Sequence, residues 1–212
     1  MSASYKVERF VSADAFAENT YLFYDASTLE GVVIDPGATV EELLHLISRK
    51  AISVKYILAT HAHVDHVVGA PPLIRRLGAP FMVHKSDAGL LSSARLQAAT
   101  FGYRLNEDVK ASSFFDDRDV FGISDMTLRV IHTPGHSRGS SCFFVDNEIL
   151  FTGDTLFAGS VGRTDLPGGS AKDLTSSLKL LAGLDDDVII YPGHMEESTI
   201  GAEKASNPFM VG

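Results

Sequence analysis

Residues 60–66, THAHVDH, place three histidines and one aspartate in one short segment of a chain that has only 8 histidines in 212 residues. The segment directly follows the apolar run VKYILA. Imidazole and carboxylate groups are the side chains that bind Zn²⁺, Fe and Mn²⁺ in proteins. In a tight loop, His61 and His63 can face one ion while Asp65 and His66 face another. The spacing therefore predicts a metal site.

Polar residues of the same kind follow three further strand-like runs. His136 follows LRVIHTPG, Asp154 follows EILFTG and His194 follows VIIYPG. Each run ends in a glycine, which has no Cβ and lets the backbone turn sharply into a site. Strands that run in the same direction bring their ends to one edge of a sheet, where α/β proteins place ligands. We therefore expect seven residues to converge: His61, His63, Asp65, His66, His136, Asp154 and His194.

These seven side chains exceed the ligands that one tetrahedral zinc ion uses. A pair of divalent metal ions is the economical interpretation, with zinc favoured and Fe or Mn as alternatives. In two-metal sites with ions about 3.5–4 Å apart, one carboxylate commonly bridges them. Asp154, isolated between the two histidine groups, is the candidate for that bridge.

The pattern around these residues predicts alternating strands and helices. Capping-box patterns at Thr39 and Ser170 begin two helices, and a third helix is expected to start at prolines and end at Gly78. Residues 92–113 show no clear period, which predicts a covering loop or short irregular helices. Of the other histidines, we expect His45 to be exposed and His84 and His132 to be structural. Strands are expected at 5–11, 19–25, 31–37, 54–60, 81–84, 126–135, 140–146, 148–154 and 187–193.

Composition predicts a single globular domain over residues 1–212, because 45% of the residues are hydrophobic and 21% are charged. We expect no membrane partner, since no apolar run approaches the ~18 residues that cross a bilayer, and no signal-peptide pattern is visible. The single cysteine, Cys142, fits a reducing compartment, which favours the cytoplasm. A net charge of −9 argues against binding nucleic acid. The oligomeric state stays open.

A serine hydrolase is an alternative interpretation of one segment. GHSRG, residues 135–139, matches the nucleophile-elbow pattern, with Asp154 or Asp165 and then His194 following Ser137 in the required order. The elbow needs a helix directly after the serine, whereas GSSCFFVD predicts a strand. A Ser137 hydrolase would also leave THAHVDH without a role. The metal site is therefore favoured.

The motifs HAHVDH, HTPGH, FTGD and YPGH, in this order, resemble the metallo-β-lactamase superfamily. The resemblance implies an α/β (α+β) fold, a four-layer αββα sandwich. GDTLFAGSVGRTDLPGG and the ending PGHMEESTIGAEKASNPFM are most similar to short, single-domain relatives of glyoxalase II, the hydroxyacylglutathione hydrolases. The resemblance to the superfamily also implies metal ligands. His61, His63 and His136 would bind one metal and Asp65, His66 and His194 the second, with Asp154 as the bridge. Asp35 would orient a metal-binding histidine.

The function implied by this resemblance is hydrolysis of S-lactoylglutathione or a related hydroxyacyl thioester by a metal-bound hydroxide. Asp65 would orient the hydroxide and accept its proton, and Arg163 would hold an anionic part of this small-molecule substrate. Full-length glyoxalase II has a C-terminal helical domain that contacts glutathione. Few residues follow His194, so we expect no such domain and weak dependence on glutathione.

A mononuclear iron persulfide dioxygenase is a second alternative with the same fold, and it would use His61, His136 and Asp154. The full second-metal set in this chain favours the hydrolase.

Overall fold

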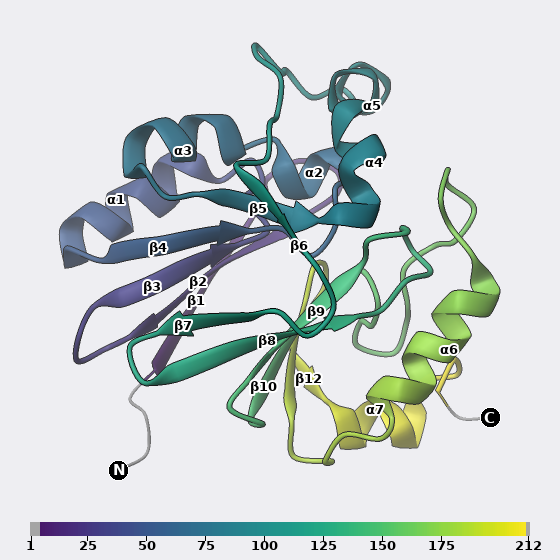
Figure 1. Cartoon of the computed structure of the whole chain (residues 1–212). Helices are drawn as coiled ribbons and strands as arrows, with labels where there is room; N and C mark the ends of the chain where they lie inside the picture. Colours follow the sequence, from purple (N-terminus) through teal and green to yellow (C-terminus); the bar gives the residue numbers. More distant parts are fainter. Residues whose placement is uncertain (1–4, 211–212) are drawn as a thin grey trace.

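The computed structural model describes residues 5–210, which form two six-stranded sheets from consecutive parts of the chain (Figure 1). The first sheet, in spatial order, contains β1 (Tyr5–Val11), β2 (Asn19–Asp25), β3 (Glu30–Ile34), β4 (Ser53–Leu58), β5 (Phe81–His84) and β6 (Ser113–Phe115). The second contains β7 (Val120–Ile123), β8 (Met126–His132), β9 (Ser141–Val145), β10 (Ile149–Gly153), β11 (Ile189–Pro192) and β12 (Ser198–Thr199).

Helices cover the outer faces of both sheets. In Figure 1, α1 and α3 lie over the first sheet, whereas α6 and α7 lie on the far side of the second. The helices are α1 (Val40–Lys50), α2 (Val64–Val67), α3 (Ala70–Leu77), α4 (Ala88–Ser92), α5 (Ala94–Phe101), α6 (Ala171–Leu181) and α7 (Ile200–Ser206), with a 3₁₀ turn at Lys85–Asp87. The predicted αββα sandwich is confirmed.

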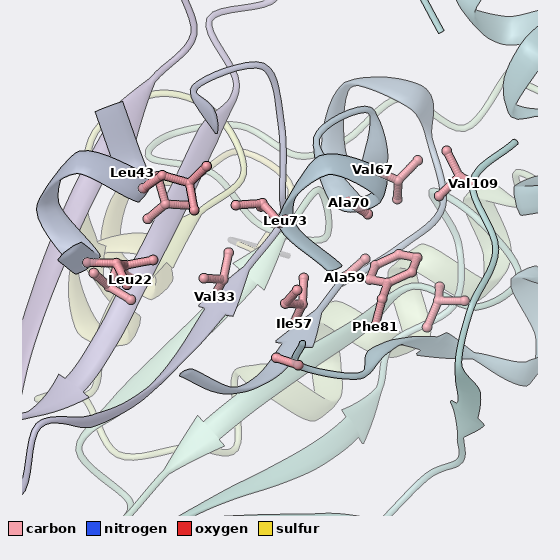
Figure 2. Packing of buried hydrophobic residues seen from close by; sticks show 14 of the residues in the cluster. Leu22, Val33, Leu43, Ile57, Ala59, Val67, Ala70, Leu73, Phe81 and Val109 are labelled. Carbon is pink, nitrogen blue, oxygen red and sulfur yellow. The ribbon is translucent and has the colours of Figure 1, made fainter. Parts of the chain in front are cut away.

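Alternating side chains of β2 build two cores at once. Tyr21 and Phe23 point into the core between the sheets, and Leu22 points to the core under α1 and α3. Figure 2 shows Leu22 near Leu43 of α1, with Leu73 of α3 over the same sheet. Burying each such side chain stabilises the fold by about 1.5–3 kcal/mol. A register slip of one residue would reverse both faces, so the positions at which the strands end are tightly fixed.

The second sheet repeats this arrangement. Phe143 packs between the sheets, whereas its neighbours Cys142 and Phe144 face the third core, which Leu174 and Leu178 of α6 close from outside. Both β8 and β10 run antiparallel to β9, and β11 runs parallel to β10. The strands β8, β10 and β11 therefore point the same way and end at one edge, as predicted.

Of the two predicted helix caps, Ser170 is confirmed and Thr39 is wrong. Ser170 is extended and its hydroxyl oxygen accepts a hydrogen bond from the Asp173 amide at 3.2 Å. Gly78 ends α3 with a φ of 67°. Thr39 precedes α1, but its hydroxyl makes no capping bond and has no partner. The reason is its backbone, at φ −87° and ψ 36°, which is outside the extended region that aims a cap side chain at the helix.

Several short elements are not predicted by the sequence pattern. These are β6, β7, β12, α4, α7, the 3₁₀ turn at Lys85–Asp87 and the helical turn α2 inside the histidine segment, where a loop was expected. Each is too short to show a period of its own. The 92–113 region includes all of α5, a short helix, which is one of the two predicted possibilities. Within residues 5–210, no helix is long and apolar enough to cross a membrane.

Candidate metal centre

The seven predicted residues meet at the edge where β4, β8, β10 and β11 end. They form three overlapping groups in which the candidate ligand atoms lie within 4.8 Å of one another. The groups are His61 with His63 and His136, His61 with His66 and Asp154, and Asp65 with His66 and His194. The first and third groups have the composition that the family resemblance implies for its two ions.

In the first group, Nδ1 of His63 lies 2.7 Å from Nε2 of His136. The His61 ring is 4.8 Å from the His63 ring and 4.7 Å from the His136 ring. Nε2 of His61 is buried and has no hydrogen-bond partner. A buried polar atom without a partner is costly in free energy. Three imidazoles converging around such an atom fit a divalent cation.

In the third group, Nε2 of His66 and Nε2 of His194 are 3.3 Å apart. The Oδ2 atom of Asp65 is 3.7 Å from the first of these nitrogens and 3.5 Å from the second. Two imidazoles and one carboxylate make a second donor set of the kind that Zn²⁺, Fe and Mn²⁺ accept.

Asp154 lies between the two sets. Its Oδ2 atom is 3.4 Å from Nε2 of His136 and 3.5 Å from Nε2 of His194, and its Oδ1 atom is 3.4 Å from Nε2 of His66. The Oδ1 atom is buried without a hydrogen-bond partner. A Cβ on Gly193 would sit 2.5 Å from this Oδ1 atom, so the glycine before His194 is required by close packing. The position suits a bridging carboxylate.

The outward ring nitrogens of three histidines are held by acceptors. Nδ1 of His136 lies 2.7 Å from the Arg163 carbonyl oxygen, and Nδ1 of His194 lies 2.9 Å from the Phe16 carbonyl oxygen. Nδ1 of His66 lies 3.1 Å from Oδ2 of Asp35. The two carbonyl oxygens place a proton on Nδ1 of His136 and His194, and the nearby Asp35 carboxylate favours one on Nδ1 of His66. Each Nε2 is left directed at the centre, a common arrangement in metal-binding histidines.

Asp35 is therefore where the family resemblance places it, beside a candidate ligand. Its carboxylate also accepts hydrogen bonds from the amide and the hydroxyl of Thr60, at 2.6 Å and 2.9 Å. The Thr60 hydroxyl in turn lies 3.1 Å from Nδ1 of His61. The backbone of Asp35 is left-handed, with a φ of 52°, a strained conformation for an aspartate. One buried carboxylate thus orients ligands of both groups.

Asp87 is a supporting residue that the sequence did not reveal. It is buried at the end of the 3₁₀ turn, and its Oδ2 atom accepts hydrogen bonds from the Ala62 amide at 3.0 Å and the Ser137 hydroxyl at 2.7 Å. Its Oδ1 atom accepts from the Gly139 amide at 2.6 Å. Burial raises the pKa of this carboxyl, and the three donors oppose that rise. The residue joins the His61–His63 segment to the loop after His136.

Glu18 is a second residue that pattern reasoning missed. It is fully buried beside the centre, where a Cβ on Gly37 would collide with its carboxyl group. Its carboxyl oxygens lie 3.3 Å and 3.2 Å from the Thr20 hydroxyl. Burial raises the pKa of Glu18 well above its ordinary value. The available signal was a charged residue immediately before a strand that is buried throughout.

The charge distribution divides the histidines into two classes. Burial lowers the pKa of His61 well below its usual value and lowers that of His63 to about 4. Burial would also lower the pKa values of His66 and His194, but nearby carboxylates outweigh it and raise them to about 10 and about 11. The Asp154 pKa is held well below normal, because the histidine charges outweigh the effect of burial.

Ser137 is not arranged as a catalytic nucleophile with a histidine base. Its hydroxyl donates to Asp87 and also lies 2.9 Å from the Ser140 hydroxyl, and it is 1% exposed. The next regular element is β9, a strand, as predicted. Among the described residues, no histidine hydrogen-bonds to Ser137. The elbow match is therefore accidental.

A cavity of about 220 Å³ opens over the centre. Candidate ligands from both groups lie in its wall, and the partly exposed Arg163 also lines it. The Arg163 guanidinium is exposed and forms two hydrogen bonds of 2.6 Å to Asp165. The remaining lining is largely aromatic and aliphatic: Phe16, Val64, Phe101, Phe157 and Leu166.

An αββα sandwich with histidine and aspartate donors at one edge is the architecture of a class of metal-dependent hydrolases. The chain belongs to this class: the model of the Metallo-beta-lactamase superfamily matches residues 13–194. Its fold and donor groups indicate divalent metal ions.

Comparison with individual proteins gives similarity over nearly the whole chain. A protein of Haemophilus influenzae named hydroxyacylglutathione hydrolase GloC is 34% identical, covering 94% of this chain and 96% of its own. The crystal structure of TTHA1623 in a di-iron-bound form is 36% identical with a TM-score of 0.85, covering 96% of this chain and 100% of that one. The structure of the BLEG-1 B3 metallo-beta-lactamase is 31% identical with a TM-score of 0.85, covering 98% and 100%.

Proposed function

We propose that this protein is a binuclear thioester hydrolase that acts on S-lactoylglutathione or a related hydroxyacyl thioester, with zinc as its metal. The observation that carries the proposal is the complete second donor group, Asp65, His66 and His194, beside the first. A mononuclear enzyme would have no use for it. The similarity to a relative named hydroxyacylglutathione hydrolase supports the choice of substrate.

Paired divalent ions in such a site supply Lewis acidity and lower the pKa of water. The protein's own contribution begins with Asp65, which lies in the cavity wall with its Oδ2 atom between two imidazole nitrogens. Although burial raises its pKa, the His66 charge and a His194 hydrogen bond lower it overall, so the group is a carboxylate at neutral pH. Its Oδ2 atom can orient an attacking water and accept its proton.

The leaving group fits the polar groups of the cavity. Apart from the candidate ligands, the described lining offers only Gln97 and Arg163 as polar side chains, and neither is a general acid at neutral pH. A thiolate leaves without protonation far more readily than an amine or an alkoxide. The site therefore suits thioesters. The Arg163 guanidinium would bind an anionic part of the substrate in place of Asp165.

The test uses the protein loaded with zinc and, separately, with Fe²⁺, each with three probes in parallel: S-lactoylglutathione, glutathione persulfide with an oxygen electrode, and a chromogenic β-lactam. We expect thioester cleavage that is lost in His194→Ala along with about one metal equivalent. Oxygen consumption with intact thioesters would replace the proposal with the mononuclear iron alternative. Cleavage of the β-lactam alone would assign the site to the activity named for BLEG-1.

A further inference from the structure

Apart from the candidate ligands, the lining of the cavity is mostly hydrocarbon. Its apolar residues are Phe16, Phe101 and Leu166, which are partly exposed, and Val64 and Phe157, which are buried. The side chains of Phe16 and Phe101 are 37% and 38% exposed, so part of each ring is open to a ligand in the cavity. A ligand that covered these rings would bury apolar surface, which is the main source of favourable free energy in such sites.

This lining is held in place before any ligand binds. The Phe16 ring lies edge-on to Phe101 at 5.7 Å and stacks on Tyr103 at 5.7 Å. The Tyr103 hydroxyl donates to Asp14 Oδ2 at 2.9 Å, and the Phe16 amide donates to Asp14 Oδ1 at 2.9 Å. The loop between β1 and β2 is thus tied to the end of α5, so little conformational freedom is lost when the rings receive a ligand.

The polar groups of the lining are already engaged. The Gln97 side-chain oxygen accepts from the Val64 amide at 3.1 Å, and its NH₂ group donates to the Leu90 carbonyl oxygen at 3.0 Å. Arg163 is paired with Asp165. Apart from the candidate ligands, the described lining therefore leaves hydrocarbon as the surface that meets the part of a substrate inside the cavity.

We propose that the cavity is an acyl subsite, in which Phe16 and Phe101 select short hydrocarbon chains beyond the carbonyl. The proposal rests on the hydrolase function proposed above and specifies its substrate class. The cavity volume of about 220 Å³ is below the roughly 300–1,000 Å³ of sites for drug-sized ligands, so only the acyl end of a thioester fits inside. The thiol carrier lies outside the aromatic rings. In a 2-hydroxyacyl thioester the hydroxyl faces the ligands, and the carbons after it face the rings.

The experiment varies only the acyl chain, in glutathione thioesters of lactate, 2-hydroxybutanoate and 2-hydroxypentanoate. Each added methylene should raise kcat/KM of the metal-loaded protein by about fourfold, the factor for fully burying one CH₂ group. Phe101→Ala should reduce the gain in kcat/KM per methylene to less than twofold, and Phe101→Leu should restore most of that gain. Leu96→Ala is the matched control, because Leu96 lies on the same helix, is 71% exposed and is outside the cavity.

A binding measurement separates this proposal from the hydrolase function. Calorimetry with the corresponding free 2-hydroxy acids should show Kd falling with chain length in the wild type and in Leu96→Ala, but not in Phe101→Ala. If no thioester is cleaved while this pattern holds, the acyl subsite stands and the hydrolase function fails. If thioesters are cleaved with the same kcat/KM at every chain length, or if Phe101→Ala keeps the wild-type dependence, the subsite is refuted.

Discussion

Replacing Asp87 with alanine should loosen both ligand segments of the first metal group at once. The carboxylate is the common acceptor for the Ala62 amide, the Ser137 hydroxyl and the Gly139 amide, and each of these three groups is buried. Ala62 lies between two candidate ligands, and Ser137 directly follows a third. Without the carboxylate, the two amides lose their acceptor in a place that water does not readily reach, and the Ser137 hydroxyl keeps only its contact with the Ser140 hydroxyl.

The expected cost follows from these contacts. A hydrogen bond to a charged group contributes about 1.5–3 kcal/mol, and the three bonds share one acceptor, so their sum is less than additive. We expect Asp87→Ala to lower the free energy of unfolding by about 3–5 kcal/mol, a large share of the 5–15 kcal/mol of a typical protein. Residues that orient metal ligands usually change metal affinity by about 10–100-fold, so zinc binding should weaken by that factor.

The assay pairs urea unfolding of the metal-free protein with zinc titration against a chromophoric chelator. Ser137→Ala is the graded control: it removes one of the three bonds, should cost about 1.5–3 kcal/mol and should leave turnover within a few fold of wild type. If Asp87→Ala loses stability but keeps wild-type zinc affinity, Asp87 does not position the ligands. A loss of many thousandfold in turnover for Ser137→Ala would instead revive the nucleophile interpretation.

Four further outcomes follow from the geometry and the charges of the centre. Metal analysis should give about two equivalents per chain, and Asp154→Asn should lower both the metal content and the turnover. Because the carboxylates raise the pKa of His66 to about 10 and that of His194 to about 11, zinc binding at pH 8 should release about two protons, measurable by calorimetry in buffers of different ionisation enthalpy. By the same shifts, the metal-free protein should lose stability as pH rises from about 6.5 towards those values, because protons bound in the folded state are then lost. When the free metal concentration is about a thousandfold above Kd, removing the metal should lower Tm by roughly 10 °C. An unchanged melting curve would show that the ions do not couple the strand ends.

The sequence predicted the parts of the site that depend on local pattern. A strand followed by a glycine turn and a ligand residue is visible within one segment, so the positions of His136, Asp154 and His194 could be inferred without coordinates. The sandwich followed from the order of strands and helices together with the family motifs. Serine caps and glycine ends of helices are similarly local, and Ser170 and Gly78 behave as expected.

The residues that support the ligands could not be inferred in this way. Asp87 acts on Gly139, which is 52 positions away in the chain, and nothing near either residue marks the pairing. In the sequence, little distinguishes Glu18 from an exposed charged residue; its burial depends on close packing against Gly37 in the folded chain. Thr39 fails as a cap because its backbone is determined by its surroundings and not by the capping motif. Long-range packing decides each case.

The division of the chain into two consecutive sheets has a consequence for assembly. Residues up to Phe115 build one sheet and contribute His61, His63, Asp65 and His66, whereas residues from Val120 onward build the other and contribute His136, Asp154 and His194. Neither part contains all the ligands of either metal group: His136 completes the first group and His194 completes the other. Binding of each ion would therefore require that the two halves have docked. A nick in the exposed segment 117–119 would then create a complementation pair, in which recovery of catalysis measures the affinity of one half for the other.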